Sequence, residues 1–212
     1  MLRWNMQNRT KAAMINRINQ ALRRLPPWVL YLLGGIYPCW LLYLGLTGGL
    51  GPDPVKALEH ALGERALQLV ILGLTVTPLR RLTGLSLLKF RRAIGVLTFS
   101  YVALHLLVWL VLDVQILSQI LTDIAKRPYI TIGMAAFVLM LPLVLTSNNF
   151  SVRKLGRRWT RLHLLTYPAA ILGGLHYVML VKGFQIEPLI YMVAILALLA
   201  LRIPSSRRRA AA

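Results

Sequence analysis

Apolar residues in this chain gather into six long stretches, and charged residues are concentrated in the short segments between them. About 20 apolar residues in a helix cross a hydrocarbon core of about 30 Å. The second stretch is the shortest, and we expect its helix to begin earlier, in the amphipathic segment 55–65 that follows Pro52-Asp53-Pro54. The pattern predicts six transmembrane helices, over residues 28–46, 66–79, 93–112, 129–145, 162–181 and 186–203.

The basic residues predict how these helices are oriented. If both termini are cytoplasmic, 20 of the 25 Lys and Arg residues lie on the cytoplasmic side and all six acidic residues lie on the opposite side. An excess of Lys and Arg in cytoplasmic loops is the usual rule for membrane proteins. The sequence therefore predicts an all-α polytopic membrane protein with both termini in the cytoplasm.

Composition agrees with a membrane protein. The chain is 57% apolar, with a mean hydropathy of +0.63, which is too hydrophobic for a soluble domain of 212 residues. A net charge of +19 would suggest a nucleic-acid partner in a soluble protein. Here the charges lie in short loops beside the spans, so topology and contact with anionic membrane lipids account for them. We expect no nucleic-acid partner.

The predicted organisation is one transmembrane domain, residues 28–203, between basic cytoplasmic tails at 1–27 and 204–212. The first tail has the pattern either of a basic amphipathic helix on the membrane surface or of a partly disordered topogenic segment. No loop is long enough to fold alone, and the chain has neither a G-x-G-x-x-G fingerprint nor a Walker motif. Its function is therefore expected within or beside the membrane.

Three histidines lie within the predicted spans, where ionisable side chains are costly and usually functional. His105 follows Arg92 by 13 residues and His176 follows Leu162 by 14, so each lies roughly 20 Å from the inner boundary. Both spans run outward, which places the two imidazoles at nearly the same level. Two facing imidazoles between helices form an axial ligand pair for haem iron, an arrangement suited to electron transfer. The alternative is that each histidine only forms hydrogen bonds between helices.

The third histidine, His163, begins the fifth span, roughly 20 Å along the helix from His176. On an ideal helix the two side chains point about 140° apart, although Pro168 and Gly173-Gly174 between them favour a kink. The third span has Arg91 where a second haem would need another histidine. A second haem at His163 and a contact of His163 with a propionate or a lipid headgroup both remain open.

Two basic loops, residues 80–92 and 153–161, carry arginines suited to bidentate contacts with haem propionates or a flavin phosphate. Topogenic charge is the alternative for each of them, and packing at the membrane interface is the alternative for the tryptophan of the second loop. His60, beside Glu59 and Glu64, is expected at the solvated surface. The candidates for cofactor binding in these loops are Arg91, Arg92, Arg158 and Trp159.

Several motifs resemble one known family. The chain contains TPLRRL and FRRAIGV before His105, then KRPYITIG, RKLGRRWTRLHLLTYPAA and an HY pair at 176–177. A longer motif, GGLGPDPVKALEHALGERAL, covers 48–67. In this order these motifs resemble the MsrQ (YedZ) family, the haem-binding membrane subunits of periplasmic methionine sulfoxide reductase systems. That family lies within the ferric-reductase-like transmembrane group.

The resemblance implies a haem b protein of the bacterial inner membrane. Its expected role is to pass electrons to MsrP, a periplasmic molybdopterin reductase, for the repair of oxidised periplasmic proteins. The resemblance also implies the quinone pool or a cytoplasmic flavin reductase as electron donor, and FMN as a further cofactor. The family's haem histidines match His105, His163 and His176, and one haem between the third and fifth spans is the preferred reading. The alternative is a non-redox transporter or assembly partner.

Overall fold

The computed structural model describes residues 2–181 and 183–202, with the backbone alone over residues 2–10. All of its regular elements are helical, which confirms the predicted all-α class. The predicted tail at 204–212 lies outside the described residues. In chain order the elements are α1 (Leu2–Arg24), α2 (Trp28–Leu46), α3 (Pro54–Thr83), η1 (Leu88–Phe90), α4 (Arg91–Val108), η2 (Trp109–Val114), α5 (Leu117–Lys126), α6 (Pro128–Leu145), α7 (Asn149–Leu155), α8 (Arg157–Leu162), η3 (His163–Leu165), α9 (Thr166–Leu180) and α10 (Ile186–Ala200).

Four helical segments of the described chain are long and apolar enough to cross a membrane: Trp28–Leu46, Pro54–Thr83, Leu88–Val114 and Pro128–Leu145. They correspond to the first four predicted spans. The helix α10 is apolar but has 15 residues, and α9 also has 15, although α8 and η3 lead into it almost without a break. The chain is thus a membrane protein, while the count of six spans and the cytoplasmic termini stay predictions.

The long helix α3 begins where its sequence predicts. Pro54 is its first residue, a position at which proline loses no helical hydrogen bond. The Asp53 side chain caps the helix by accepting a hydrogen bond from the Lys56 N–H at 3.3 Å. The hydrogen bond from the Lys56 side chain, and next the one from its backbone N–H, lower the pKa of Asp53. Gly84, with φ of 80°, ends the helix in the left-handed region. At 30 residues α3 is about 45 Å long, so it extends beyond a hydrocarbon core of about 30 Å.

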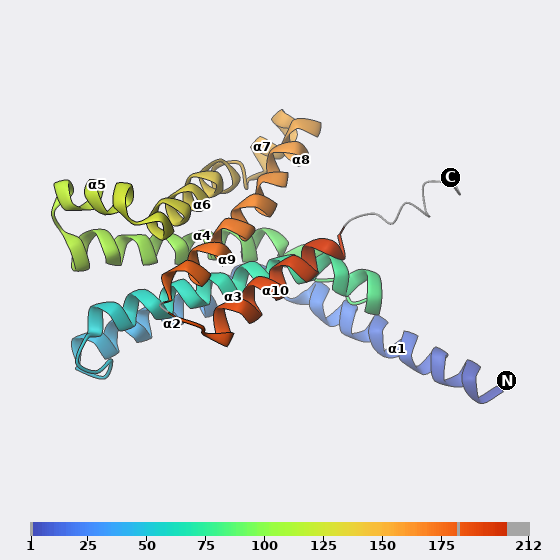
Figure 1. Cartoon of the computed structure of the whole chain (residues 1–212). Coiled ribbons are helices and arrows are strands. Elements are labelled where there is room, and N and C mark those ends of the chain that lie inside the picture. Colours follow the sequence, from blue (N-terminus) through green and yellow to red (C-terminus); the bar gives the residue numbers. More distant parts are fainter. Residues whose placement is uncertain (1, 182, 203–212) are drawn as a thin grey trace.

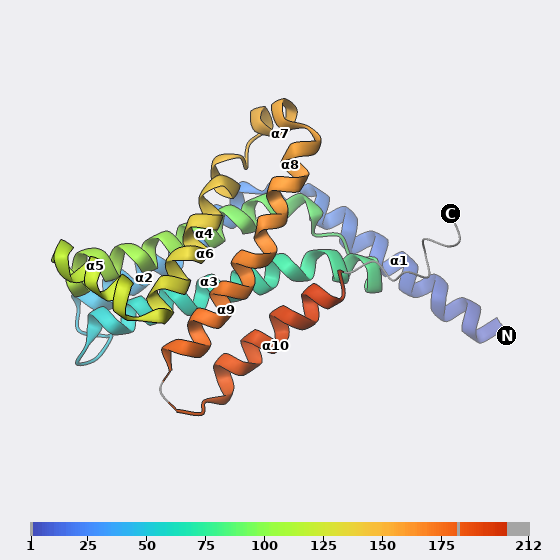
Figure 2. The ribbon, with the colours of Figure 1, turned by 45° about the horizontal axis from the view of Figure 1, so that its top comes forward.

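The helices form two groups that cross each other (Figures 1 and 2). In the first group α2, α3 and α4 pack together, and in the second α6 packs against α9. The helix α10 packs against both α9 and α3 and so joins the two groups. We call the end of the bundle that carries α5 and the start of α3 the α5 end, and the opposite end, where α1 attaches, the α1 end.

The helix α1 projects away from the bundle at the α1 end (Figure 1). Its attachment is specific, because Asn19 donates to the Gly84 carbonyl oxygen at 3.0 Å and accepts from the Ser86 N–H at 2.9 Å. The predicted tail 1–27 is therefore largely helical, while its contact with a membrane surface stays a prediction.

Proline residues inside two helices create free carbonyl groups that side chains of other helices satisfy. Pro38 in α2 lacks an N–H, so the Gly34 carbonyl four residues earlier has no helical donor. The Tyr101 hydroxyl of α4 donates to that oxygen at 2.6 Å, and the Tyr101 side chain is buried. This bond holds α2 against α4.

Pro78 in α3 frees the Leu74 carbonyl in the same way. The Arg202 guanidinium, just after α10, donates to this oxygen at 2.7 Å and to the Gly73 oxygen at 3.0 Å. The same guanidinium lies 5.6 Å from the centre of the Tyr167 ring. Arg202 thus fixes the end of α10 to the turn of α3 that precedes Pro78.

We expect Tyr101→Phe to destabilise the protein by about 1 kcal/mol, because the half-buried Gly34 carbonyl, which has no helical donor, then loses the Tyr101 hydroxyl. For a chain of this size that corresponds to a fall in Tm of about 2–4 °C, measured by thermal unfolding in detergent. Tyr43→Phe is the matched control, since Tyr43 is an exposed tyrosine of α2. Equal effects of the two substitutions would contradict the assignment.

Candidate functional site

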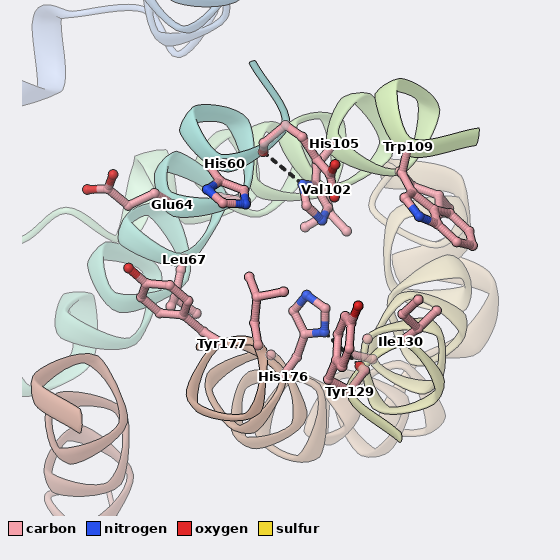
Figure 3. A pocket seen from close by; sticks show the side chains of 18 of the residues that line it. His60, Glu64, Leu67, Val102, His105, Trp109, Tyr129, Ile130, His176 and Tyr177 are labelled. Carbon is pink, nitrogen blue, oxygen red and sulfur yellow. Dashed lines mark hydrogen bonds between the residues drawn. The ribbon is translucent and has the colours of Figure 1, made fainter. Parts of the chain in front are cut away.

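A cavity of about 760 Å³ lies between the α3–α4 pair and the α6–α9 pair (Figure 3). His105 of α4 and His176 of α9 face each other across it. Their ring centroids are 6.3 Å apart and their planes are inclined by 76°. The structure thus brings together the two histidines that the sequence places at one level.

Each of these rings forms one hydrogen bond with the backbone of the neighbouring helix. Nδ1 of His105 lies 2.9 Å from the Glu59 carbonyl oxygen, and Nδ1 of His176 lies 2.7 Å from the Tyr129 carbonyl oxygen. A carbonyl only accepts, so Nδ1 carries the proton and Nε2 of the neutral ring keeps a lone pair. Figure 3 shows these second nitrogens pointing toward one another. Histidines that bind metals are oriented in this way.

A glycine lies against each ring. Gly63 and Gly133 stand four residues after Glu59 and Tyr129 on the same two helices. A Cβ atom would lie 3.1 Å from Nδ1 of His105 at the first position and 2.8 Å from Nδ1 of His176 at the second. Sequence reasoning missed both glycines. The available signal was an isolated glycine inside a helical pattern, which often marks a close packing contact.

Much of the cavity wall is apolar, with Val102, Leu106, Ile130 and Phe137 among its residues. Trp109 also lines the cavity and begins η2, a turn of π-helix that follows α4 four residues after His105. Single π-helical turns are frequent at functional sites. The two Nε2 atoms therefore face a cavity whose wall is largely apolar.

The rim of the cavity at the α5 end is charged. Its basic residues are Lys56 and Arg127, and its acidic residues are Glu59, Glu64, Asp113 and Glu187. Arg127 pairs with Asp123 at 3.2 Å. The hydrogen bond to the Tyr129 hydroxyl, with help from the charge of Asp123, raises the pKa of Arg127, so this side chain stays charged.

His60 is exposed, as expected, but it also lines the cavity (Figure 3). Its ring comes from α3, one residue after the carbonyl that accepts from His105. Sequence reasoning placed His60 at the surface because its neighbours are acidic. It missed that the start of α3 forms a wall of the cavity.

Two other candidate residues, His163 and Trp159, lie away from this cavity, in the segment from α8 to η3 that leads into α9. Nε2 of His163 lies 3.2 Å from the Thr146 hydroxyl, and the Trp159 ring stacks on the His163 ring with centroids 3.9 Å apart. Trp159 also donates to the Thr146 carbonyl at 2.9 Å. His163 begins η3, a short 3-10 turn, so the helix through it is not the continuous one assumed for the 140° offset.

The candidate arginines do not line the cavity either. Arg91 is the exposed first residue of α4, and Arg158 is exposed in α8. Arg92 donates to the Asn149 side chain at 2.7 Å and so connects α4 to α7. Their roles in cofactor binding stay predictions.

The cavity residues fit a haem group. The separation of 6.3 Å between ring centroids leaves room for one metal ion between two facing imidazole nitrogens, because metal–imidazole bonds are about 2 Å long. The Nδ1 hydrogen bonds fix the tautomer that binds iron, and the missing Cβ atoms of Gly63 and Gly133 make room for the rings. The surrounding wall is apolar, as a porphyrin requires.

Comparison with known proteins agrees with this class of site. The family described as "Ferric reductase like transmembrane component" matches residues 63–174, a range that includes His105 and ends two residues before His176. The chain is therefore a ferric-reductase-like transmembrane protein. Over 185 residues it is 50% identical to the protein-methionine-sulfoxide reductase heme-binding subunit MsrQ of Brucella anthropi, covering 86% of this chain and 84% of that one.

The corresponding MsrQ subunits of Brucella ovis and Brucella canis are each 51% identical over 177 residues, which are 83% of this chain and 80% of theirs. The chain belongs to the MsrQ family, as its motifs indicate. No solved structure matches it.

We expect His105→Ala and His176→Ala each to abolish a low-spin haem spectrum, because one imidazole cannot supply both axial ligands. The visible spectrum of each purified variant measures this. His60→Ala is the control and should keep the spectrum, since its ring belongs to the rim. A full low-spin spectrum in His105→Ala would contradict the paired site.

His163→Ala should keep the haem spectrum, because His163 contacts Thr146 and Trp159 and lies outside the cavity. Under the reading with one haem, the same substitution should slow reduction of the haem from the cytoplasmic side. Haem counted per polypeptide and the rate of reduction give the two readouts. Loss of half of the haem would establish a second haem at His163 and overturn the preference for one.

Proposed function

We propose that this chain is the haem b membrane subunit that delivers electrons to a periplasmic methionine sulfoxide reductase. The observation that carries the proposal is the His105–His176 pair, with both Nδ1 atoms bound to carbonyls and both Nε2 atoms facing the cavity. The names of the Brucella relatives, heme-binding subunits of such a reductase, support it.

His105 and His176 are the residues that would hold the haem iron, through the Nε2 atoms that face the cavity. Haem, when bound, supplies a one-electron iron(III)/iron(II) couple. With both imidazoles as ligands, the iron would keep no open position, which would favour electron transfer over reactions that need one. The chain has a single cysteine, Cys39, so it lacks the C-x-x-C-H motif for covalent attachment. Binding through histidines alone makes this a b-type site.

The remaining cavity residues orient the group and shield it. The apolar wall suits the porphyrin ring, and the basic side chains at the rim, Lys56 and Arg127, suit the propionates. Each of these basic side chains also forms an ion pair with an aspartate: Lys56 with Asp53 at 2.9 Å and Arg127 with Asp123 at 3.2 Å. Charge is thus confined to one end of the cavity.

The charge bias of the loops supports an orientation in which the α5 end lies on the periplasmic side of the membrane. We propose six spans, cytoplasmic tails at 1–27 and 204–212, and a location in the bacterial inner membrane. The cavity rim then faces the periplasm, where MsrP, a molybdopterin reductase, is the proposed acceptor. The proposed donors on the inner side are the quinone pool or a cytoplasmic flavin reductase, with FMN as a further cofactor near the basic loops.

The acidic rim is the proposed docking surface, because small redox contacts are often steered by charge. Combined Glu59→Gln, Asp113→Asn and Glu187→Gln should slow electron delivery to the periplasmic partner and weaken its dependence on salt, with the haem spectrum unchanged. Reoxidation of the pre-reduced protein by the purified partner, at several ionic strengths, measures this.

The matched control removes three charges at the opposite end, by Arg153→Gln, Lys154→Gln and Arg157→Gln. These residues are exposed and belong to the α7–α8 region, so the control should reoxidise at the wild-type rate. Equal rates in the acidic variant and in the wild type would rule out this docking surface. No reoxidation by the partner in the wild type would overturn the proposed function.

A further inference from the structure

The two helix pairs beside the cavity hold their histidines by the same device. In each pair a backbone carbonyl accepts from Nδ1, and a glycine follows that carbonyl by four residues on the same helix. The first set is Glu59 and Gly63 on α3 with His105 on α4. The second is Tyr129 and Gly133 on α6 with His176 on α9.

The glycines are what allow each ring to reach the backbone. A Cβ atom on Gly133 would lie 2.8 Å from Nδ1 and 3.0 Å from Cε1 of His176. On Gly63 the corresponding distances to His105 are 3.1 and 3.2 Å. Contacts under 3.0 Å are essentially never seen for real Cβ atoms, and 3.0–3.4 Å already requires the neighbour to shift. A methyl group would therefore push each imidazole away from its carbonyl.

The strength of these hydrogen bonds matters for a bound metal. When Nδ1–H donates to a carbonyl, the ring becomes a more basic ligand through its other nitrogen. A more basic ligand stabilises iron(III) relative to iron(II). Lengthening the Nδ1–carbonyl hydrogen bond therefore raises the reduction potential.

We propose that Gly63 and Gly133 are positioning residues that set the orientation of His105 and His176 and thereby the reduction potential of the iron they hold. This inference rests on the proposed haem function. It differs from that function because it assigns the tuning to two residues that have no ligating atom.

The test is Gly63→Ala and Gly133→Ala in the full-length protein, with potentiometric titration of the haem and low-temperature electron paramagnetic resonance of the oxidised state. Both variants should show a raised potential and an altered low-spin signal, and the effect should be larger for Gly133→Ala because its contact is closer. Alanine is the better helix former, so loss of helix propensity does not explain such a change.

Two matched controls separate this effect from a general effect of alanine. A Cβ atom on Gly73 of α3 would lie 3.5 Å from Ile94, an ordinary contact, and a Cβ atom on Gly95 of α4 would have no neighbour within 4 Å. Gly73→Ala and Gly95→Ala, neither of which lines the cavity, should keep the wild-type potential and signal. If Gly133→Ala does not accumulate as folded protein, Gly63→Ala, with the milder contact, decides the question.

Wild-type potentials and signals in both glycine variants would overturn the inference while leaving the proposed function intact. Equal shifts in the control variants would overturn it as well. Absence of haem from the wild type and from both controls would instead overturn the proposed function itself.

Discussion

The structure depends on the hydrogen bonds from the two imidazole Nδ1–H groups to helix carbonyls. In the apolar interior of a membrane protein, an imidazole without a partner is costly, and a ring that turns freely cannot hold a metal in a defined geometry. Binding Nδ1 to the Glu59 and Tyr129 carbonyls solves both problems, because it satisfies the donor and directs Nε2 into the cavity. The spacing of α3 from α4 and of α6 from α9 follows from it, since each ring must reach the backbone of its partner helix.

The same physical rule operates elsewhere in the bundle. The carbonyls released by Pro38 and Pro78 lack a helical donor, and Tyr101 and Arg202 supply the missing donors from other segments of the chain. These bonds tie α2 to α4 and the end of α10 to α3. They brace the α3–α4 pair from two sides, so the position of His105 relative to His176 is supported by contacts far from the cavity.

Much of this arrangement could be predicted from the sequence, because membrane thickness and helix rise are constants. The first four apolar stretches match the long helices, the Pro-Asp-Pro turn begins α3, and counting residues placed His105 and His176 opposite each other. The short 3-10 turn at His163 and the π-helical turn after α4 could not be predicted, since both are local departures from ideal helix geometry. Gly63, Gly133 and the wall position of His60 depend on how helices approach one another, and periodicity along one helix carries no record of its neighbour.

The central claim is that one haem lies between His105 and His176. The most direct measurement is the visible spectrum of the purified wild-type protein, oxidised and dithionite-reduced, with haem quantified per polypeptide. The account predicts one b-type haem per chain, with a Soret band that shifts on reduction and sharp low-spin α and β bands. A correctly folded protein that is colourless, or one with a high-spin spectrum, would contradict it.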